Sequence, residues 1–459
     1  MRKKIVRLIA LILLLTPAGE SGICAGAEPE ATQGTAAKPM LKLSLRQAVG
    51  IALSPEGNAR VQLAEEMIRQ ARSRSAQARA ALLPNVDSAV SQQSQTRNLA
   101  AVGIQISFPV IGFTVPTFLG PFNVFDARAA ATQTLFDLSS IRRFQASRAG
   151  ISQAEAEKES ARDQTRDLVA RAYLAALRAQ ASLEAVQSNI QLSEALLKVA
   201  DDQKNAGTGT GIEVTRARVQ LANERQRLLV ARNELRSANL QLLKAVGLDL
   251  DVQIELTDRL SLLPVEPITP ERALEIALGS RADWKGQQKR QETTRLNSDA
   301  IKMERLPSVV LFGDYGSSGS SINHNFPTRT YGFQVRIPIF DGGRRDARRT
   351  EAYSLVRQEV IREKDLRRQI ELEIRTALDS LGSADEQVKT AEEGLTLSQN
   401  ELAQAQRRYK AGMGSGIEVT DAQNRLERAR DNRVAALFNH SLARIELSSA
   451  TGTIRQVTE

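Results

Sequence analysis

Cysteine and histidine are nearly absent from this chain of 459 residues, which has one cysteine and two histidines. Apart from Cys24, which lies in the N-terminal segment described below, nothing can form a disulfide, a thiolate metal site or a cysteine nucleophile. His324 and His440 lie in unrelated contexts and form no catalytic or metal-binding set. Carboxylates lie mostly on helical stretches with basic neighbours, which is the common surface pattern. We therefore expect neither an enzyme nor a metal or cofactor site.

Aromatic residues are also scarce, at 4 %, and glycine and proline are few, at 28 and 14 residues. The abundant residues are Ala, Leu, Gln, Glu and Arg, a mixture that favours long helices over β-sandwiches or disordered chain. The formal net charge is +9, but the charges mostly alternate along predicted helices, as on solvated helix faces. Because the chain also carries an export signal, we expect no nucleic-acid partner.

That signal occupies the N-terminal 27 residues. A basic start is followed by an apolar run at 8–15, which is too short to span a bilayer, and by small residues suited to cleavage at 25–27. Ile23 stands before Cys24, where lipoprotein processing needs a small residue, so we expect no lipid there. Removal of four basic residues and one acidic residue leaves a net charge of +6. Residues 28–42 would then form a linker.

The rest of the chain consists of two similar sequence repeats. The stretch AGTGTGIEVT at 206–215 returns as AGMGSGIEVT at 411–420, an offset of 205 residues. Similarity extends in both directions from these stretches. We therefore predict a first repeat, a connecting segment, a second repeat and a C-terminal tail at residues 43–247, 248–267, 268–454 and 455–459.

A very long helix is expected before each glycine-rich stretch. The helices at 138–204 and 344–410 would each be roughly 100 Å long at about 1.5 Å per residue. Asp137 and Asp341 precede them and are candidate N-caps. Small and apolar residues follow a spacing near 3.5, which indicates helices packed lengthwise along a seam. The predicted seam comprises Ala176, Ala179, Leu183, Val186, Ile190, Ser193, Leu197, Ala200, Ala377, Leu381, Ala384, Val388, Ala391, Leu395, Ser398, Leu402, Ala405 and Tyr409.

Two amphipathic strands are predicted in each repeat. Apolar and polar residues alternate from Tyr331 to Ile339. Leu-Pro pairs mark the start of each upstream strand, because proline disfavours helical conformation in the preceding residue. Strands of this length suit a tilted crossing of a bilayer, for which about 9–11 residues suffice. The strands are placed at roughly 85–98, 127–132, 307–317 and 331–339.

Loops are expected between the paired strands. Residues 99–125 carry no charge, but their prolines and glycines argue against a transmembrane helix and favour an apolar loop. The counterpart at 317–329 is polar and rich in Gly and Ser, as in a surface hairpin loop.

The predicted fold is mainly helical with a transmembrane β-barrel part, built from two tandem repeats that each supply two strands and a helical hairpin about 100 Å long. Four strands cannot close a membrane barrel, which needs at least about eight. Two chains would supply eight strands and three chains twelve, so we expect an oligomer. A small soluble sheet at one end of the helices is the structural alternative.

The glycine-rich stretches are predicted to be turns between helices. Both lack the third glycine of a dinucleotide fingerprint and the Gly-Lys-Ser/Thr of a phosphate loop. Gly207 and Gly412 suit a left-handed helix C-cap. The stretches that start at Thr210 and Ser415 match the S/T-x-x-E capping box, which begins the next helix.

The chain resembles the outer-membrane efflux proteins of the TolC kind. The resemblance spans about residues 43–453 and is carried by the two-fold repeat, the Leu-Pro strand entries, the Phe-Asp-Gly-Gly exit at 340–343 and the paired glycine turns. It implies a homotrimer in the outer membrane of a Gram-negative bacterium, with a 12-stranded barrel in outer-membrane lipid and a 12-helix tunnel in the periplasm. It also implies a periplasmic adaptor protein and an inner-membrane pump of the RND, ABC or MFS type as partners.

The resemblance assigns roles at the tips of the tunnel. Glu418 and Asp421 match acidic positions that line the entrance, and Tyr409 with Glu213 matches a pair that holds it shut. The family has an arginine lock where this chain has Gly414, and we hypothesise that Arg216 of one hairpin pairs with Asp421 of a neighbouring one instead. Glu213 and Glu418 could equally be capping carboxylates only. The expected adaptor-docking turns contain Gly207, Gly209, Gly211, Gly412, Gly414 and Gly416.

The predicted function is a passive exit duct of a tripartite efflux or type I secretion system. The alternative is a non-conducting, envelope-spanning coiled-coil spacer or adhesin-like stalk. The strand at 331–339 discriminates between them, because a spacer has no use for a strand with one lipid-ready face.

Overall fold

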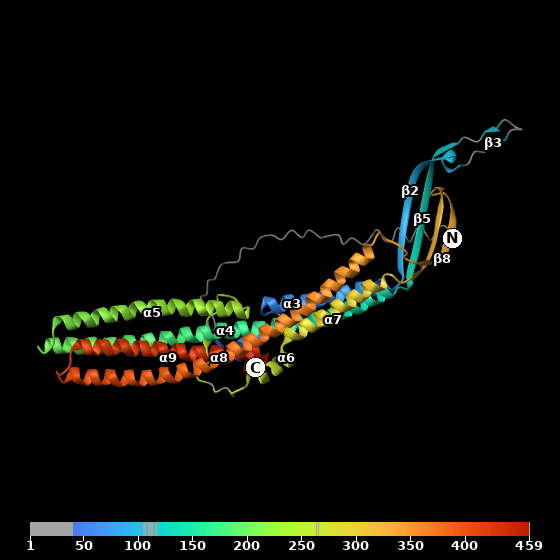
Figure 1. Ribbon diagram of the computed structural model, residues 1–459. Helices are drawn as coiled ribbons and strands as arrows, with labels where there is room; N and C mark the ends of the chain where they lie inside the picture. Colours follow the sequence, from blue (N-terminus) through green and yellow to red (C-terminus); the bar gives the residue numbers. More distant parts are fainter. Residues whose placement is uncertain are drawn as a thin grey trace, which may run out of the picture. The chain divides into compact units, whose positions relative to one another are not determined.

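The computed structural model describes residues 40–103, 107–108, 113–114, 117–262, 264 and 266–458 (Figure 1). The expected signal peptide at 1–27 and all but the end of the linker at 28–42 lie outside the described residues. The unit formed by Met40–Glu459 is described by itself below.

Two helical hairpins dominate this unit. The first joins α4 (Leu138–Asn205) to α5 (Gly211–Val246), and the second joins α8 (Arg344–Lys410) to α9 (Gly416–Ala450). The prediction of the two long helices is confirmed, and their 68 and 67 residues correspond to about 100 Å each. The second arms are about half as long. The other part of each long helix packs against α3 (Ala59–Ala80) or α7 (Ala282–Met303) instead (Figure 1).

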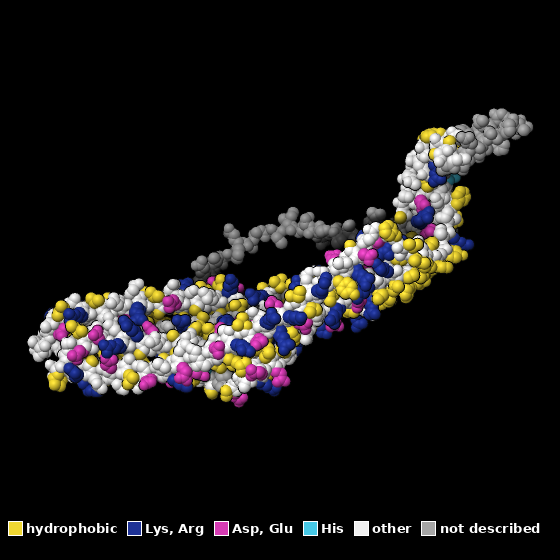
Figure 2. Space-filling model, in the orientation of Figure 1, with side chains coloured by type: hydrophobic (Ala, Val, Ile, Leu, Met, Phe, Trp, Pro, Cys, Tyr) yellow, Lys and Arg dark blue, Asp and Glu magenta, His cyan; other side chains and the backbone are white. Residues whose placement is uncertain are grey.

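The seam predicted along the long helices is buried or half-buried throughout. In α8, for example, Ala377, Ala384 and Val388 are at most 4 % exposed. Charged side chains of both signs are scattered over the visible helical surface (Figure 2). The alternating charges therefore lie on solvated faces, as their pattern indicates.

The N-caps of the long helices differ between the copies. Asp137 caps α4 as predicted, and its Oδ1 accepts a hydrogen bond from the backbone N of Ser139 at 3.0 Å. In α8 the predicted cap is wrong by two residues, because Gly343 occupies the N-cap position with a φ of +83°. Asp341 still serves the helix start, since its Oδ2 accepts from the backbone N of Arg345 at 3.1 Å.

A small core lies near the middle of the long helices. There β1 (Leu41–Leu43) pairs in parallel with β6 (Ile254–Leu256), which lies in the expected connecting segment. The helix α2 (Leu45–Ala52) packs beside them against α4. Tyr173 of α4 donates its hydroxyl to Asp258 Oδ2 at 2.8 Å and lies 3.0 Å from the carbonyl oxygen of Leu43.

The second repeat has its own core and the chain end. Trp284 of α7, Ile370 of α8 and Leu447 of α9 pack together with residues of α6 (Pro270–Ser280). The expected C-terminal tail is mostly a short helix, α10 (Ile454–Thr458). Arg455 ties it to α4, with its Nε 3.3 Å from Asp163 Oδ1.

The four strands form one antiparallel sheet in the order β2-β5-β7-β8. Both predicted loops are shorter than expected. The apolar segment contains η1 (Leu99–Val102) and the short pair β3 (Ser107–Phe108) and β4 (Phe113–Thr114), and its last part already belongs to β5. The strands are β2 (Asn85–Asn98), β5 (Phe118–Phe136), β7 (Ser308–Ser321) and β8 (His324–Arg336).

The Gly/Ser-rich loop expected at 317–329 is almost entirely strand, with its turn at residues 322–323. Glycines in and beside this stretch permit close approach of backbones. A Cβ on Gly319 would lie 2.0 Å from the carbonyl oxygen of His324, and one on Gly316 would lie 2.4 Å from the Cβ of Arg128. The strand also ends earlier than its alternation indicates, at Arg336.

Register gives the sheet two different faces, because directly paired residues share a face. One face carries seven large exposed apolar residues, Val86, Val90, Leu311, Tyr315, Tyr331, Phe333 and Val335, together with Arg329 opposite Tyr315. The other carries Asp87, Asp126, Arg128, Asp314, Thr330 and Gln334, with Arg128 paired to both Asp126 and Asp314. Within the described chain β2 and β8 are the edges of this sheet, and each is paired on one side only.

Candidate functional site at the hairpin tips

The two glycine turns have the conformation predicted from the sequence. Gly207 and Gly412 have φ values of +73° and +71°, the left-handed region that ends a helix without strain only at glycine. A Cβ on Gly209 would lie 3.0 Å from that of Gln203, so this glycine is needed where the chain folds back on the last helical turn. A Cβ on Gly414 would lie 3.1 Å from the Cβ of Arg408.

The two capping boxes are not equivalent. In the first turn, Glu213 Oε2 accepts a hydrogen bond from the backbone N of Thr210 at 3.1 Å, as predicted. In the second, Ser415 Oγ accepts from the backbone N of Glu418 at 3.4 Å, but the reciprocal bond is not formed. The Glu418 carboxylate lies instead 3.7 Å from Arg408 Nε, because this cation competes for it.

Tyr409 and Glu213 meet between the two hairpins. Tyr409 is 9 % exposed on α8 and packs on Val419 and Ala422 of α9. Burial raises the pKa of the Tyr409 hydroxyl, and the charge of Glu213 and a hydrogen bond to its carboxylate raise it further. Glu213 therefore serves as a cap and also contacts the tyrosine of the other hairpin.

Arg216 and Asp421 do not meet within the protomer. Arg216 lines a recess of about 40 Å³ together with Glu213, Tyr409 and Gly416. Asp421 is exposed on α9, one helical turn beyond the exposed Glu418. Within the described residues neither Arg216 nor Asp421 forms an ion pair.

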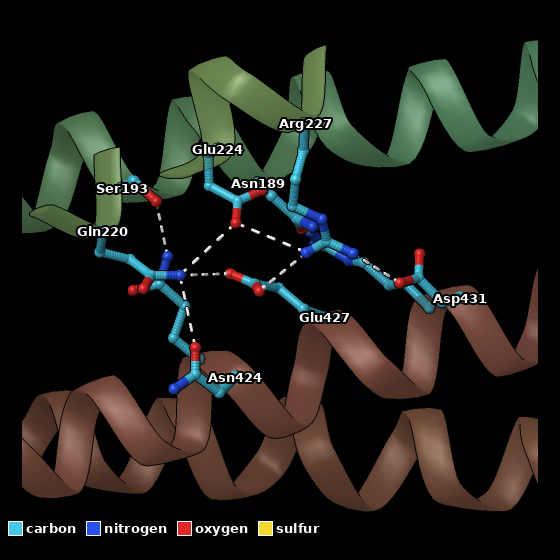
Figure 3. A network of polar contacts seen from close by, with 10 residues as sticks. Asn189, Ser193, Gln220, Glu224, Arg227, Asn424, Glu427 and Asp431 are labelled. Carbon is cyan, nitrogen blue, oxygen red and sulfur yellow. Dashed lines mark hydrogen bonds and ion pairs between the residues drawn. The ribbon is translucent and has the colours of Figure 1, made fainter. Parts of the chain in front are cut away.

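A buried polar network that was not predicted from the sequence lies further along the hairpins. Gln220, Glu224 and Arg227 of α5 face Glu427 and Asp431 of α9 (Figure 3). A signal was present in the sequence. Gln220, Glu224 and Arg227 are spaced four and three residues apart, as the apolar seam residues are. This spacing predicts that their side chains face another helix.

Short contacts link the network across the hairpins. Gln220 Nε2 donates to Glu427 Oε1 at 3.0 Å, and lies 3.3 Å from Asn424 Oδ1. Arg227 reaches Glu427 Oε2 at 3.1 Å with Nη1 and Asp431 Oδ2 at 2.7 Å with Nη2. Beside them, Gln423 Nε2 donates to Ser193 Oγ of α4 at 2.6 Å.

The titratable centre of the network is Glu427. Its pKa is raised to about 7, first by burial and then by the negative charge of Glu224, while Arg227 acts in the opposite direction. No group of three or more His, Cys, Asp or Glu in the described part of the chain is arranged to hold a metal ion. Among the same residues, no helix is both long and apolar enough to cross a membrane.

An open four-stranded sheet with one apolar face, joined to helices about 100 Å long, suits a chain that supplies part of an outer-membrane channel. The chain belongs to the outer membrane efflux protein family, whose sequence profile matches residues 52–248 and 273–453. It is an outer-membrane channel of efflux or secretion systems in Gram-negative bacteria and not an enzyme. The predicted family, fold class, function and location are therefore confirmed.

Related proteins share the sequence and the fold at low identity. The alkaline protease secretion protein AprF of Pseudomonas aeruginosa is 22 % identical over 333 residues, which cover 70 % of this chain and 68 % of AprF. The pyoverdine export outer membrane protein OpmQ of Pseudomonas putida is 24 % identical, with 62 % and 61 % covered. The crystal structure of VceC from Vibrio cholerae superposes with a TM-score of 0.72 at 19 % identity, covering 89 % of this chain and 96 % of VceC.

Proposed function

We propose that three copies of this chain form a passive export duct whose entrance lies at the hairpin tips. The supporting observation is the sheet, whose edge strands β2 and β8 lack partners on their outer sides within the described chain. Such edges must be paired or covered. Three protomers would supply twelve strands in outer-membrane lipid and twelve helical segments around a periplasmic tunnel. Residues 43–247 and 268–454 would be the two repeats of each protomer, and residues 1–27 would be removed on export.

At the entrance, Glu418 and Asp421 lie exposed on one face of α9. In a trimer they would place six carboxylates around the opening, which would favour cations. Tyr409 and Glu213 would hold the hairpins of each protomer together. Arg216 would pair with Asp421 of the neighbouring subunit, in the place of the arginine that Gly414 replaces.

The partners we propose are a periplasmic adaptor and an inner-membrane pump of the RND, ABC or MFS type. The adaptor would dock on the turns that contain Gly207, Gly209, Gly211, Gly412, Gly414 and Gly416. Relatives named for protease secretion and for pyoverdine export support a partnered duct and leave its cargo class open.

The test is to purify the chain from outer membranes and record ion conduction in planar bilayers. We expect heat-modifiable trimers that conduct with a preference for cations. Asp421→Asn should weaken this preference, whereas Asp249→Asn, the same charge change on an exposed connecting residue, should not. A non-conducting rod would refute the duct and support the spacer. For the proposed lock, unchanged conductance in both Arg216→Ala and Asp421→Ala would refute pairing.

A further inference from the structure

The buried network places two carboxylates of different hairpins against each other. Glu224 is 1 % exposed on α5, and Glu427 is 6 % exposed on α9 (Figure 3). Glu224 follows the start of α5 at Gly211 by 13 residues, so the pair lies roughly 20 Å from the tips. It is therefore separate from the entrance residues Glu418 and Asp421.

The charges around this pair do not balance when both carboxyl groups are ionised. Arg227 is the cation that contacts both, at 3.5 Å from Glu224 and 3.1 Å from Glu427. It also pairs with Asp431, which is 45 % exposed on α9. From α4, the nearby side chains are the neutral Asn189 and Ser193, and Arg430 is bonded to Asn189. A second buried negative charge thus lacks a cation of its own, and buried unpaired charge is costly.

The contacts around the pair also connect these two helices. α5 packs along α4, and α9 packs along α8 and α4, whereas α5 reaches α9 through long polar side chains. Glu224 Oε2 is buried and has no hydrogen-bond partner among the described residues. A protonated carboxyl on Glu427 would supply a donor to Glu224, whereas two carboxylates would repel each other.

We propose that Glu224 and Glu427 bind one shared proton that fastens α5 to α9, and that release of this proton favours separation of the hairpins and opening of the entrance. The inference rests on the proposed function, because it requires an entrance at the tips. It adds a gate element, set apart from the Tyr409–Glu213 pair, that responds to pH.

The direction of the response follows from the raised pKa of Glu427, about 7. The proton stabilises the fastened state fully below the ordinary pKa of a carboxyl, and this contribution is lost as the pH rises through about 7. If Glu427 regains an ordinary pKa when the hairpins separate, the ratio of closed to open channels falls about tenfold between pH 6 and pH 8.

The experiment is single-channel recording of the full chain in planar bilayers from pH 5.5 to 8.5. We expect the open probability to rise with pH around a midpoint near 7. Glu427→Gln should abolish the rise, since an amide keeps the volume but does not ionise. Glu224→Gln should shift the rise to lower pH, because it removes the negative charge that raises the pKa of Glu427 while burial remains. Arg227→Gln should shift the midpoint upward by about one unit, because it removes the cation that favours ionised Glu427. A merely structural role would not move the midpoint.

Matched controls separate this site from other ionisable side chains. Asp249→Asn removes an exposed carboxylate of the connecting segment and should leave the midpoint unchanged. His440→Asn removes a buried histidine whose Nε2 lies 3.0 Å from Asp385, and it should do the same. A wild-type channel that conducts equally at all these pH values refutes the proton site but not the duct. A pH response that either control variant abolishes and that Glu427→Gln retains also refutes the proton site. Absence of conduction at every pH refutes the duct itself.

Discussion

The two faces of the sheet lead to a paired prediction at neighbouring residues of β8. Tyr331 lies near the middle of this strand and is 83 % exposed on the apolar face. Thr330 lies on the polar face, directly opposite Asp314, which bonds to Arg128. If the apolar face contacts lipid, Tyr331→Arg places a cation near the bilayer midplane and costs about 2–4 kcal/mol per chain. Thr330→Arg meets water and a carboxylate, so its cost is near zero.

The assay is the yield of heat-stable trimers in the outer-membrane fraction, with the denaturant midpoint of the purified trimers as a second readout. A cost of about 2–4 kcal/mol in each of three chains should remove most assembled Tyr331→Arg protein, because about 1.4 kcal/mol is a tenfold change in an equilibrium constant. Thr330→Arg should assemble as the wild type does. Equal loss in both variants, or loss confined to Thr330→Arg, would refute the assignment of the faces.

Three further changes test other parts of the chain. Tyr409→Phe removes a hydrogen bond to Glu213 while leaving the Glu213 cap on Thr210, so the open probability in bilayers should rise about tenfold, for a loss of about 1.4 kcal/mol. Gly412→Ala forces a Cβ into the left-handed region and should lower trimer stability by about 1 kcal/mol per chain in a denaturant titration, whereas Gly394→Ala, inside α8 with open space around it, should be neutral or stabilising. Tyr173→Phe removes the bond to Asp258 and should cost about 1–3 kcal/mol in the same titration, with conductance unchanged.

The helical part of the fold could be predicted because its signals are local or repeated. The ends of α4 and α8 fall within one residue of their predicted positions, since a strand exit and a glycine turn bound each helix. The strand boundaries were predicted less well. Phe118–Phe136 and Ser308–Ser321 are held by pairing with each other, and their Gly, Pro and Ser content hides that pairing from local inspection.

The side-chain contacts at the tips were less accessible for a different reason. Glu213 and Glu418 occupy equivalent positions and the same motif, yet one caps its helix and contacts Tyr409 while the other lies near Arg408. The two stretches differ at two of ten positions, and Arg408 stands where the first repeat has Gln203, so part of the difference is local. The contact of Glu213 with Tyr409 depends on how the two hairpins pack. Single-sequence patterns contain no direct information on that packing.

The polar network shows how the duplicated scaffold became asymmetric. At an offset of 205 residues, the counterpart of Glu224 is Ala429 and the counterpart of Glu427 is Ala222. Each repeat thus contributes one buried carboxylate. At the position equivalent to the carboxylate of the other repeat, it has an alanine. Two copies of either repeat alone would bring together no such carboxyl pair, whereas the two diverged copies do. The equivalent tip positions Arg216 and Asp421 differ in the same way. The residues that are identical in the two repeats account for the shared scaffold. At these diverged positions, different ionisable side chains of the two repeats can face each other.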